Sequence, residues 1–406
     1  MQSSPTARYI DVLTLPRVPL TFGSALIGRA AYALVFLPLL YAVTDAAGSI
    51  ALGGAAVATY GATASFLSPV RAWLIDRFGA RPVLALLTVM FGGALAAIAT
   101  ASLVGSVGAT LIVLAGVAGA VAPPLGPTMR VAWGALAPSS AQLRKALSLD
   151  AVAEELLYLA GPALAGIALA FIAPGLALYV PAALVTVGGL CFVATSAVGD
   201  MSRRVRTTDV HTKSRSLLLD RRFVGVLLPA LVAGAMSGTL SVAVPASLEG
   251  NGGPAAAGVA LGLFAGGSAL GGLVYGALKV RGSLARQLVV VSAGLLVASS
   301  FVAVVSGAVA VSVVLASAGL FFSPVMIVAY VAAHAAGGER QQNAATTWVN
   351  TSHNLGGAAG SAAAGVLIQQ GGVPTAIIGT AVAGVLIIAL SGILARPAST
   401  SAKIMK

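Results

Sequence analysis

The chain has 406 residues, of which 58% are hydrophobic and 8% are charged, with a formal net charge of +12. About a quarter of the residues of a soluble domain are charged, so this composition excludes a soluble core and favours a membrane protein. The sequence has no phosphate-binding loop, no Ser/His/Asp set and no metal-spaced cluster of His or acids, so it predicts no cofactor, no metal and no enzyme.

Apolar stretches of about 20 residues predict twelve transmembrane helices. The first six cover about residues 20–44, 50–70, 82–104, 107–129, 148–173 and 176–198. The second six cover about residues 223–247, 255–278, 285–306, 308–333, 344–368 and 374–395. We therefore expect an all-α integral membrane protein of two six-helix bundles related by pseudo-two-fold symmetry. The expected units are an N-terminal bundle (1–199), a cytoplasmic basic linker (200–222) and a C-terminal bundle with a short cytoplasmic tail (223–406).

Positive charges fall on alternate connections between these spans. All of the 23 Lys and Arg residues except Arg29 lie at the termini or in the even-numbered connections, and the odd-numbered connections have none. By the positive-inside rule, both termini are cytoplasmic, as in a multi-pass protein of the cell (inner) membrane. Basic residues spread over short loops make a border at the bilayer rather than a groove, which argues against a nucleic-acid partner.

The connection after the second span, residues 72–84, carries a charged turn. Gly79 supplies the backbone freedom that a tight turn needs, and Asp76 can cap a helix end or pair with arginines. The segment resembles the cytoplasmic signature of the major facilitator superfamily, G-x-x-x-D-R-x-G-R-R-x-x-L, although Ala72 and Ala80 replace one glycine and one arginine. The resemblance implies transport by alternating access, with a conformational latch formed by Asp76, Arg77, Gly79 and Arg81.

In the fifth span, the run Gly161-Pro162 followed by Gly166 is similar to the G-P-x-x-G-G element of the antiporter branch, which includes bacterial drug and sugar efflux proteins. A Gly-Pro pair loosens a helix, and small residues allow close helix contact, so these three residues are either a hinge or ordinary packing. Ile112 stands where such antiporters usually carry an arginine, which weakens this assignment.

Three charged residues lie well inside the predicted spans. Charges in a span are costly and are therefore functional candidates. Arg29 in the first span and Glu154 and Glu155 in the fifth lie at similar depths, and the resemblance implies that these two helices are neighbours. We expect Arg29 to pair with one glutamate, with Glu155 favoured, and the three residues to couple transport to protons. A permanent buried ion pair is the alternative.

The same resemblance places the substrate between the bundles, in an apolar and adaptable pocket. The expected lining residues are Tyr32, Phe36, Met236, Phe321, Phe322, Asn350 and Asn354. Near the end of the fourth span, Pro123 and Pro124 must break or kink the helix, as a flexible segment or as its terminus.

These features favour a proton-coupled secondary transporter that exports small hydrophobic or amphipathic compounds, as multidrug efflux proteins do. Its expected partners are a small-molecule substrate, protons and the lipid bilayer, and we expect a monomer. A sugar or metabolite facilitator without proton coupling remains an alternative. A second alternative is a membrane receptor or scaffold that transports nothing.

Overall fold

The computed structural model describes residues 9–204, 217–278 and 282–394, and the regular elements in these ranges are all helical. The N-terminal half contains α1 (Tyr9–Leu13), α2 (Val18–Leu34), α3 (Phe36–Ala47), α4 (Ile50–Phe66), α5 (Ser68–Phe78), α6 (Ala80–Leu103), α7 (Gly108–Val121), α8 (Leu125–Leu136), α9 (Ser140–Leu169), α10 (Pro174–Ala177), α11 (Tyr179–Ala194) and α12 (Ser196–Arg204). The C-terminal half contains η2 (Leu217–Leu219), α13 (Arg221–Leu248), α14 (Gly253–Ala277), α15 (Leu284–Ser300), η3 (Phe301–Ala303) and α16 (Ala308–Leu394).

Several spans of the N-terminal half are built from two helices. The first span is α2 followed by α3, the second is α4 followed by α5 with a bend of 43°, and the fourth is α7 followed by α8. The last of these breaks at residues 122–124, as Pro123 and Pro124 predicted, because a proline lacks the N–H that a continuing helix needs. Helix breaks inside a bilayer free backbone carbonyls that other protein groups must satisfy.

The 87-residue α16 is three spans, because the chain reverses twice within it. Hydrogen bonds join Ser352 to Leu227 and Ser361 to Gly238, so this part of α16 runs parallel to α13. Beyond Gly372, which has a φ of 78°, the order inverts: Thr380 bonds Thr239 and Ser391 bonds Gly225. The chain therefore folds back at residues 371–374.

The evidence for the first reversal is the direction of the start of α16, which packs alongside α14. Gly267 lies against Ala316 and Gly271 against Leu320, so this part runs parallel to α14 and antiparallel to α13. Among the described residues, ten helices are long and apolar enough to span a bilayer, or eleven with α4–α5 as one bent span. The count of eleven takes residues 347–394 as one helix. Because the chain folds back within this helix, it makes two spans, and the described spans number twelve, as predicted.

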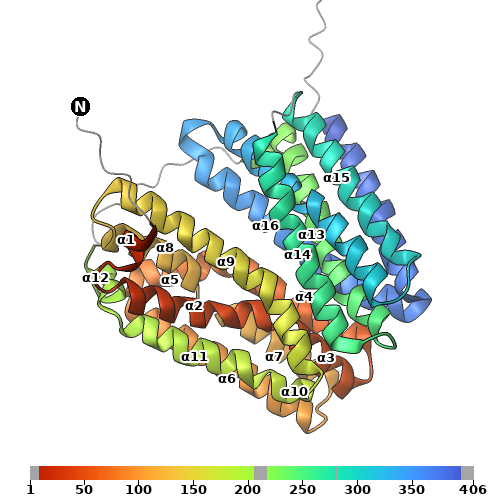
Figure 1. The fold of residues 1–406 in the computed structure, drawn as a ribbon, viewed down its shortest axis with the longest axis horizontal. Helices are drawn as coiled ribbons and strands as arrows, with labels where there is room; N and C mark the ends of the chain where they lie inside the picture. Colours follow the sequence, from red (N-terminus) through yellow and green to blue (C-terminus); the bar gives the residue numbers. More distant parts are fainter. Residues whose placement is uncertain (1–8, 205–216, 279–281, 395–406) are drawn as a thin grey trace, which may run out of the picture.

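The two halves form separate bundles (Figure 1), and most of the buried core lies within one bundle or the other. Trp133, Phe91 and Phe192 are fully buried in the first bundle, and Phe223 and Met236 in the second. Outward-facing Leu86, Val113 and Leu273 are 60%, 65% and 75% exposed, as expected for side chains in contact with lipid tails.

The bundles touch each other through glycines. We call the side of the membrane where the described chain begins and ends the terminal side, and the opposite side the far side. Gly54 of α4 lies against the backbone of Ser361 and Gly365, and Gly166 of α9 against Gly258 of α14. All of these contacts lie toward the far side, and the bundles splay apart toward α1 and α12 on the terminal side (Figure 1).

We expect Gly258→Leu to open the far side. A Cβ at Gly258 would lie 2.3 Å from the carbonyl oxygen of Pro162 and 2.9 Å from the Cα of Gly166, so the two bundles would have to separate there. The measurement is labelling of a cysteine at Ser361 by an impermeant maleimide from the far side, with Cys191 replaced by serine. Labelling should rise in Gly258→Leu and stay unchanged in Gly93→Leu, where a Cβ meets nothing within 4 Å. Equal labelling in both variants would contradict this packing.

Candidate functional site

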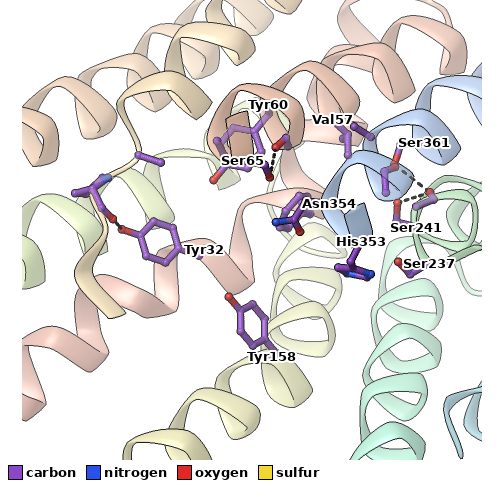
Figure 2. Close-up of a pocket in the computed structure, with 18 residues that line it drawn as sticks. Tyr32, Val57, Tyr60, Ser65, Tyr158, Ser237, Ser241, His353, Asn354 and Ser361 are labelled. Atoms are coloured by element: carbon purple, nitrogen blue, oxygen red, sulfur yellow. Dashed lines mark hydrogen bonds between the residues drawn. The ribbon is translucent and has the colours of Figure 1, made fainter. Parts of the chain in front are cut away.

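A cavity of about 420 Å³ lies between the two bundles, about midway along the spanning helices that line it (Figure 2). The N-terminal bundle contributes side chains from α2, α3, α4 and α9 and the link between α7 and α8, and the C-terminal bundle contributes α13 and α16. The lining residues are Tyr32, Phe36, Val57, Tyr60, Gly61, Ala64, Ser65, Ala122, Pro123, Tyr158, Ser237, Gly238, Ser241, His353, Asn354, Gly357, Ala358 and Ser361.

The helix break at Pro123 shapes the N-terminal wall of this cavity. The hydroxyl of Tyr32 donates a short hydrogen bond to the carbonyl of Pro123 (Figure 2). The Tyr32 ring lies 5.8 Å from that of Phe91, and the Tyr60 ring contacts those of Phe36 and Phe91. The aromatic side chains of this wall are therefore held in place from behind.

Arg71 satisfies carbonyls at two of the helix breaks. Its guanidinium donates to the carbonyls of Gly119 and Ala120 at the end of α7, at 3.1 and 3.0 Å, and to Ala64 near the end of α4. The residue is only 6% exposed. Because carbonyl ends of helices carry partial negative charge, a buried cation is stabilised there. The sequence placed Arg71 in a cytoplasmic loop, and the structure corrects this.

The C-terminal wall depends on close backbone contact between α13 and α16. A Cβ on Gly234 would meet the His353 carbonyl at 1.9 Å, and one on Gly238 would meet the Gly357 carbonyl at 2.1 Å. Glycine at both positions therefore lets the two backbones touch and brings His353 to the cavity. The His353 ring packs edge-on against Phe322, with ring centroids 5.5 Å apart.

Three of the seven predicted lining residues line the cavity, namely Tyr32, Phe36 and Asn354. The other four do not. Met236 is fully buried in the core of its own bundle, and Asn350 is exposed outside the cavity. Phe321 packs on Gly294, and Phe322 supports His353 from behind. Which face of each helix points to the cavity depends on bundle packing, which the sequence alone did not give.

Beside the cavity, two arginines and two carboxylates form an ion cluster that joins α2, α8 and α9. Arg29 Nη1 lies 2.7 Å from Asp150 Oδ1, and Arg29 Nη2 lies 3.1 Å from Glu154 Oε1. Arg130 Nε lies 3.4 Å from Asp150 Oδ2, and its Nη2 also contacts Glu154 Oε2. With both acids ionised, the four charges cancel. We refer to these four residues as the ion quartet.

The ion quartet has a buried side and an open side. Arg29 and Asp150 are 3% and 1% exposed, whereas Glu154 and Arg130 are 26% and 46% exposed. Each carboxylate accepts one hydrogen bond and makes one further ion pair without hydrogen-bond geometry. Glu154 can therefore reach solvent, while Asp150 and Arg29 cannot.

The ion quartet lies about one helical turn from the cavity on two helices. Tyr32 follows Arg29 by three residues, and Tyr158 follows Glu154 by four. On α8, Gly126 lies beside Arg29 and Glu154. Gly126 follows the cavity-lining Pro123 by three residues. A change in the pairing of the quartet would therefore act directly on the cavity wall.

The structure pairs Arg29 with Glu154. The sequence favoured Glu155, whose side chain lies outside the described residues. Asp150 and Arg130 were missed, because both fell at the predicted edges of spans. One signal could have found Asp150: it precedes Glu154 by four residues, so both carboxylates share one face of α9.

The charged turn lies between α5 and α6. Gly79 has a φ of 93°, which confirms that the turn needs glycine. Arg81 donates to the carbonyls of Val193, Ala194 and Thr195 and so caps the end of α11. Arg77 lies over the ring of Phe78 at 5.8 Å, and Asp76 is exposed at the terminal side. Arg81 thus holds the turn, while Asp76 makes no ion pair within the part of the chain that the structure describes.

The predicted hinge residues lie at two packing contacts of α9. A Cβ on Gly161 would meet Ala33 Cβ at 2.5 Å, so this glycine brings α9 against α2. Gly166 meets α14 of the other bundle, and Pro162 lies inside the continuous helix α9 between them. These contacts account for the small residues by packing, and a hinge remains a prediction.

We expect Asp150→Asn to destabilise the protein by roughly 3 kcal/mol or more, because it leaves a buried guanidinium without its hydrogen-bonded carboxylate. Asp200→Asn is the matched control, because Asp200 lies 3.8 Å from Arg17 and both are more than half exposed. That change should cost less than about 1 kcal/mol. Thermal unfolding in detergent gives the comparison, and equal melting temperatures for the two variants would contradict a buried quartet.

Comparison with known proteins agrees with this architecture. The sequence profile of the Major Facilitator Superfamily matches residues 20–335. The nucleoside transporter NupG superimposes with a TM-score of 0.70 at 13% identity, covering 94% of this chain and 99% of that one. A POT family transporter bound to 5-aminolevulinic acid gives 0.67 at 14% identity, covering 97% and 99%.

A bacterial homologue of the human lysosomal transporter Spinster, in an inward-facing and occupied conformation, gives a TM-score of 0.67 at 14% identity and covers 97% of this chain and 98% of that one. A search of curated protein sequences found no match. At these identities the structural likeness shows the fold alone, whereas the family profile covers most of the chain. The chain therefore belongs to the major facilitator superfamily and is a multi-pass secondary membrane transporter, not an enzyme.

Proposed function

We propose that this protein exports small amphipathic compounds in exchange for protons, by alternating access of its two bundles to the central cavity. The observation that carries this proposal is the position of Glu154. It is a partly exposed carboxylate that shares two arginines with a buried aspartate, one helical turn from the cavity. Intramembrane acids in such places commonly serve as proton relays.

The exchange follows from competition for Arg29 and Arg130. When Glu154 takes up a proton, its attraction to both arginines falls, and Asp150 alone then faces two positive charges. The ion quartet then carries one net positive charge, which weakens its hold on Arg130. Arg130 lies on α8, beyond the helix break at Pro123. Its release would free α8 to move relative to α7. Proton binding and movement of the cavity wall are linked by this route.

The orientation belongs to the same proposal. The bundles meet on the far side and splay apart on the terminal side, which we assign to the cytoplasm because the basic connections lie there. In this state the cavity would take up a compound from the cell. We further propose that a single chain suffices, with the N-terminal bundle (1–199) and C-terminal bundle (223–406) as its moving parts.

We expect Glu154→Gln to abolish substrate-driven proton movement, because glutamine cannot bind and release a proton. Purified protein in proteoliposomes under an imposed proton gradient is challenged with a mixed panel of amphipathic drugs, sugars and amino acids. The readout is the pH inside the vesicles. Glu155→Gln is the matched neighbour and should retain proton movement.

Full activity in both variants would contradict the role of Glu154. Solute equilibration without any proton movement in the unaltered protein would favour a facilitator. Absence of both kinds of flux would favour a receptor.

We expect Asp76→Asn to lower the maximal transport rate about tenfold, which corresponds to roughly 1.4 kcal/mol, with little change in KM. Asp76 is exposed at the terminal side and would act as a latch only when that side closes, without touching substrate. Asp220→Asn is the control, because asparagine can replace Asp220 as the N-cap of α13. A rise in KM alone for Asp76→Asn would contradict the latch.

A further inference from the structure

The cavity has an uncharged lining. Among the described residues that line it, there is no Asp, Glu, Lys or Arg. The charged groups close to the cavity already have partners. With both acids ionised, the ion quartet is neutral as a group, and the guanidinium of Arg71 donates hydrogen bonds to three backbone carbonyls. Because an uncompensated charge in a low-dielectric site is costly, the lining disfavours both cationic and anionic solutes.

The two walls of the cavity differ in chemistry. The N-terminal wall presents the rings of Phe36 and of three tyrosines. The tyrosines, Tyr32, Tyr60 and Tyr158, are labelled in Figure 2. The C-terminal wall presents hydroxyl, amide and imidazole groups, of which Ser237, Ser241, His353, Asn354 and Ser361 are labelled in Figure 2. One wall therefore suits a flat ring, and the other suits hydrogen bonds.

His353 has a buried ring nitrogen without a hydrogen-bond partner. This atom is Nδ1, which has no partner among the described residues. Of the two tautomers of a neutral imidazole, the one with its proton on Nε2 leaves Nδ1 as an acceptor. Phe322 fixes the ring from behind. A buried acceptor without a partner favours a ligand that brings a donor.

We propose that the cavity binds a neutral solute that has an aromatic ring and an N–H or O–H donor. The ring lies against the N-terminal wall, and the donor bonds to Nδ1 of His353. This inference rests on the transport function proposed above. It adds the charge, the ring and one specific contact of the substrate. It also replaces the apolar pocket expected from the sequence with a two-sided one.

The first test compares three ligands that share one ring and differ in charge. Indole-3-acetamide is neutral, tryptamine is a cation and indole-3-acetate is an anion. Isothermal titration calorimetry on the protein in lipid nanodiscs should show indole-3-acetamide binding at least about tenfold more tightly than either charged ligand, because neither charge finds a counter-charge. A fourth ligand, N,N-dimethyl-2-(1-methylindol-3-yl)acetamide, is a dimethyl amide that keeps the ring but has neither an amide N–H nor a ring N–H, and should also bind about tenfold more weakly.

The second test changes the acceptor. His353→Asn can place a carbonyl oxygen near the position of Nδ1, whereas His353→Leu removes the acceptor and keeps an apolar side chain. We expect His353→Leu to weaken indole-3-acetamide about tenfold and His353→Asn by less than about threefold. Against the dimethyl amide, both variants should match the unaltered protein.

The ligand series in the unaltered protein does not depend on either variant folding. Tighter binding of tryptamine or indole-3-acetate, or no binding by any of the four, would overturn the proposal. Equal affinities in His353→Leu and the unaltered protein would overturn the contact with Nδ1. Vesicle pH separates this inference from the proposed function: indole-3-acetamide that binds as expected but moves no protons upholds the solute class and refutes proton exchange.

Discussion

The positive charge of Arg29 constrains the N-terminal bundle more than any other single group. A guanidinium stays protonated, and this one is 3% exposed inside the membrane, so carboxylates must balance it where it lies. Asp150 and Glu154 do so from one face of α9, and Arg130 completes the balance from α8. The positions of α2, α8 and α9 relative to one another follow from this arrangement.

The need to satisfy polar groups away from bulk water also explains the side chains around the helix breaks. Breaking α7 from α8 frees carbonyls in a place without bulk water, and Tyr32 and Arg71 satisfy them. Both residues lie close to the cavity wall. Charge balance, helix breaks and the shape of the binding cavity are thus parts of one network in the N-terminal bundle, while the C-terminal bundle supplies the polar wall with His353.

The sequence predicted the features that depend on local chemistry. Twelve apolar spans, the glycine turn at Gly79 and the break at Pro123 each follow from residue types and their spacing. It did not predict features that depend on depth and rotation of the helices. Arg71 was taken for a loop residue, and Asp150 and Arg130 were taken for span edges, because apolar runs end where charges begin.

The cavity shows the same limit. Tyr32, Phe36 and Asn354 were expected to line it and do. Met236 lies on α13, which also lines the cavity, but its side chain is buried in the core of its own bundle. Asn354 of the polar wall was expected, whereas the serines and His353 could not be told apart from interhelical contacts, which such residues commonly make in spans. Only the backbone contact of Gly234 and Gly238 with α16 brings His353 into the cavity, and a single sequence does not reveal that contact.

The central claim is that the charge state of the ion quartet sets how far the bundles open on the terminal side. Spin labels at Trp73 and Leu278, with Cys191 replaced by serine, measure that opening by double electron–electron resonance in nanodiscs. We expect a distance distribution that shifts between mildly acidic and mildly alkaline pH and stays fixed in Glu154→Gln. A distribution that ignores pH in the unaltered protein, or shifts equally in Glu154→Gln, would contradict this claim.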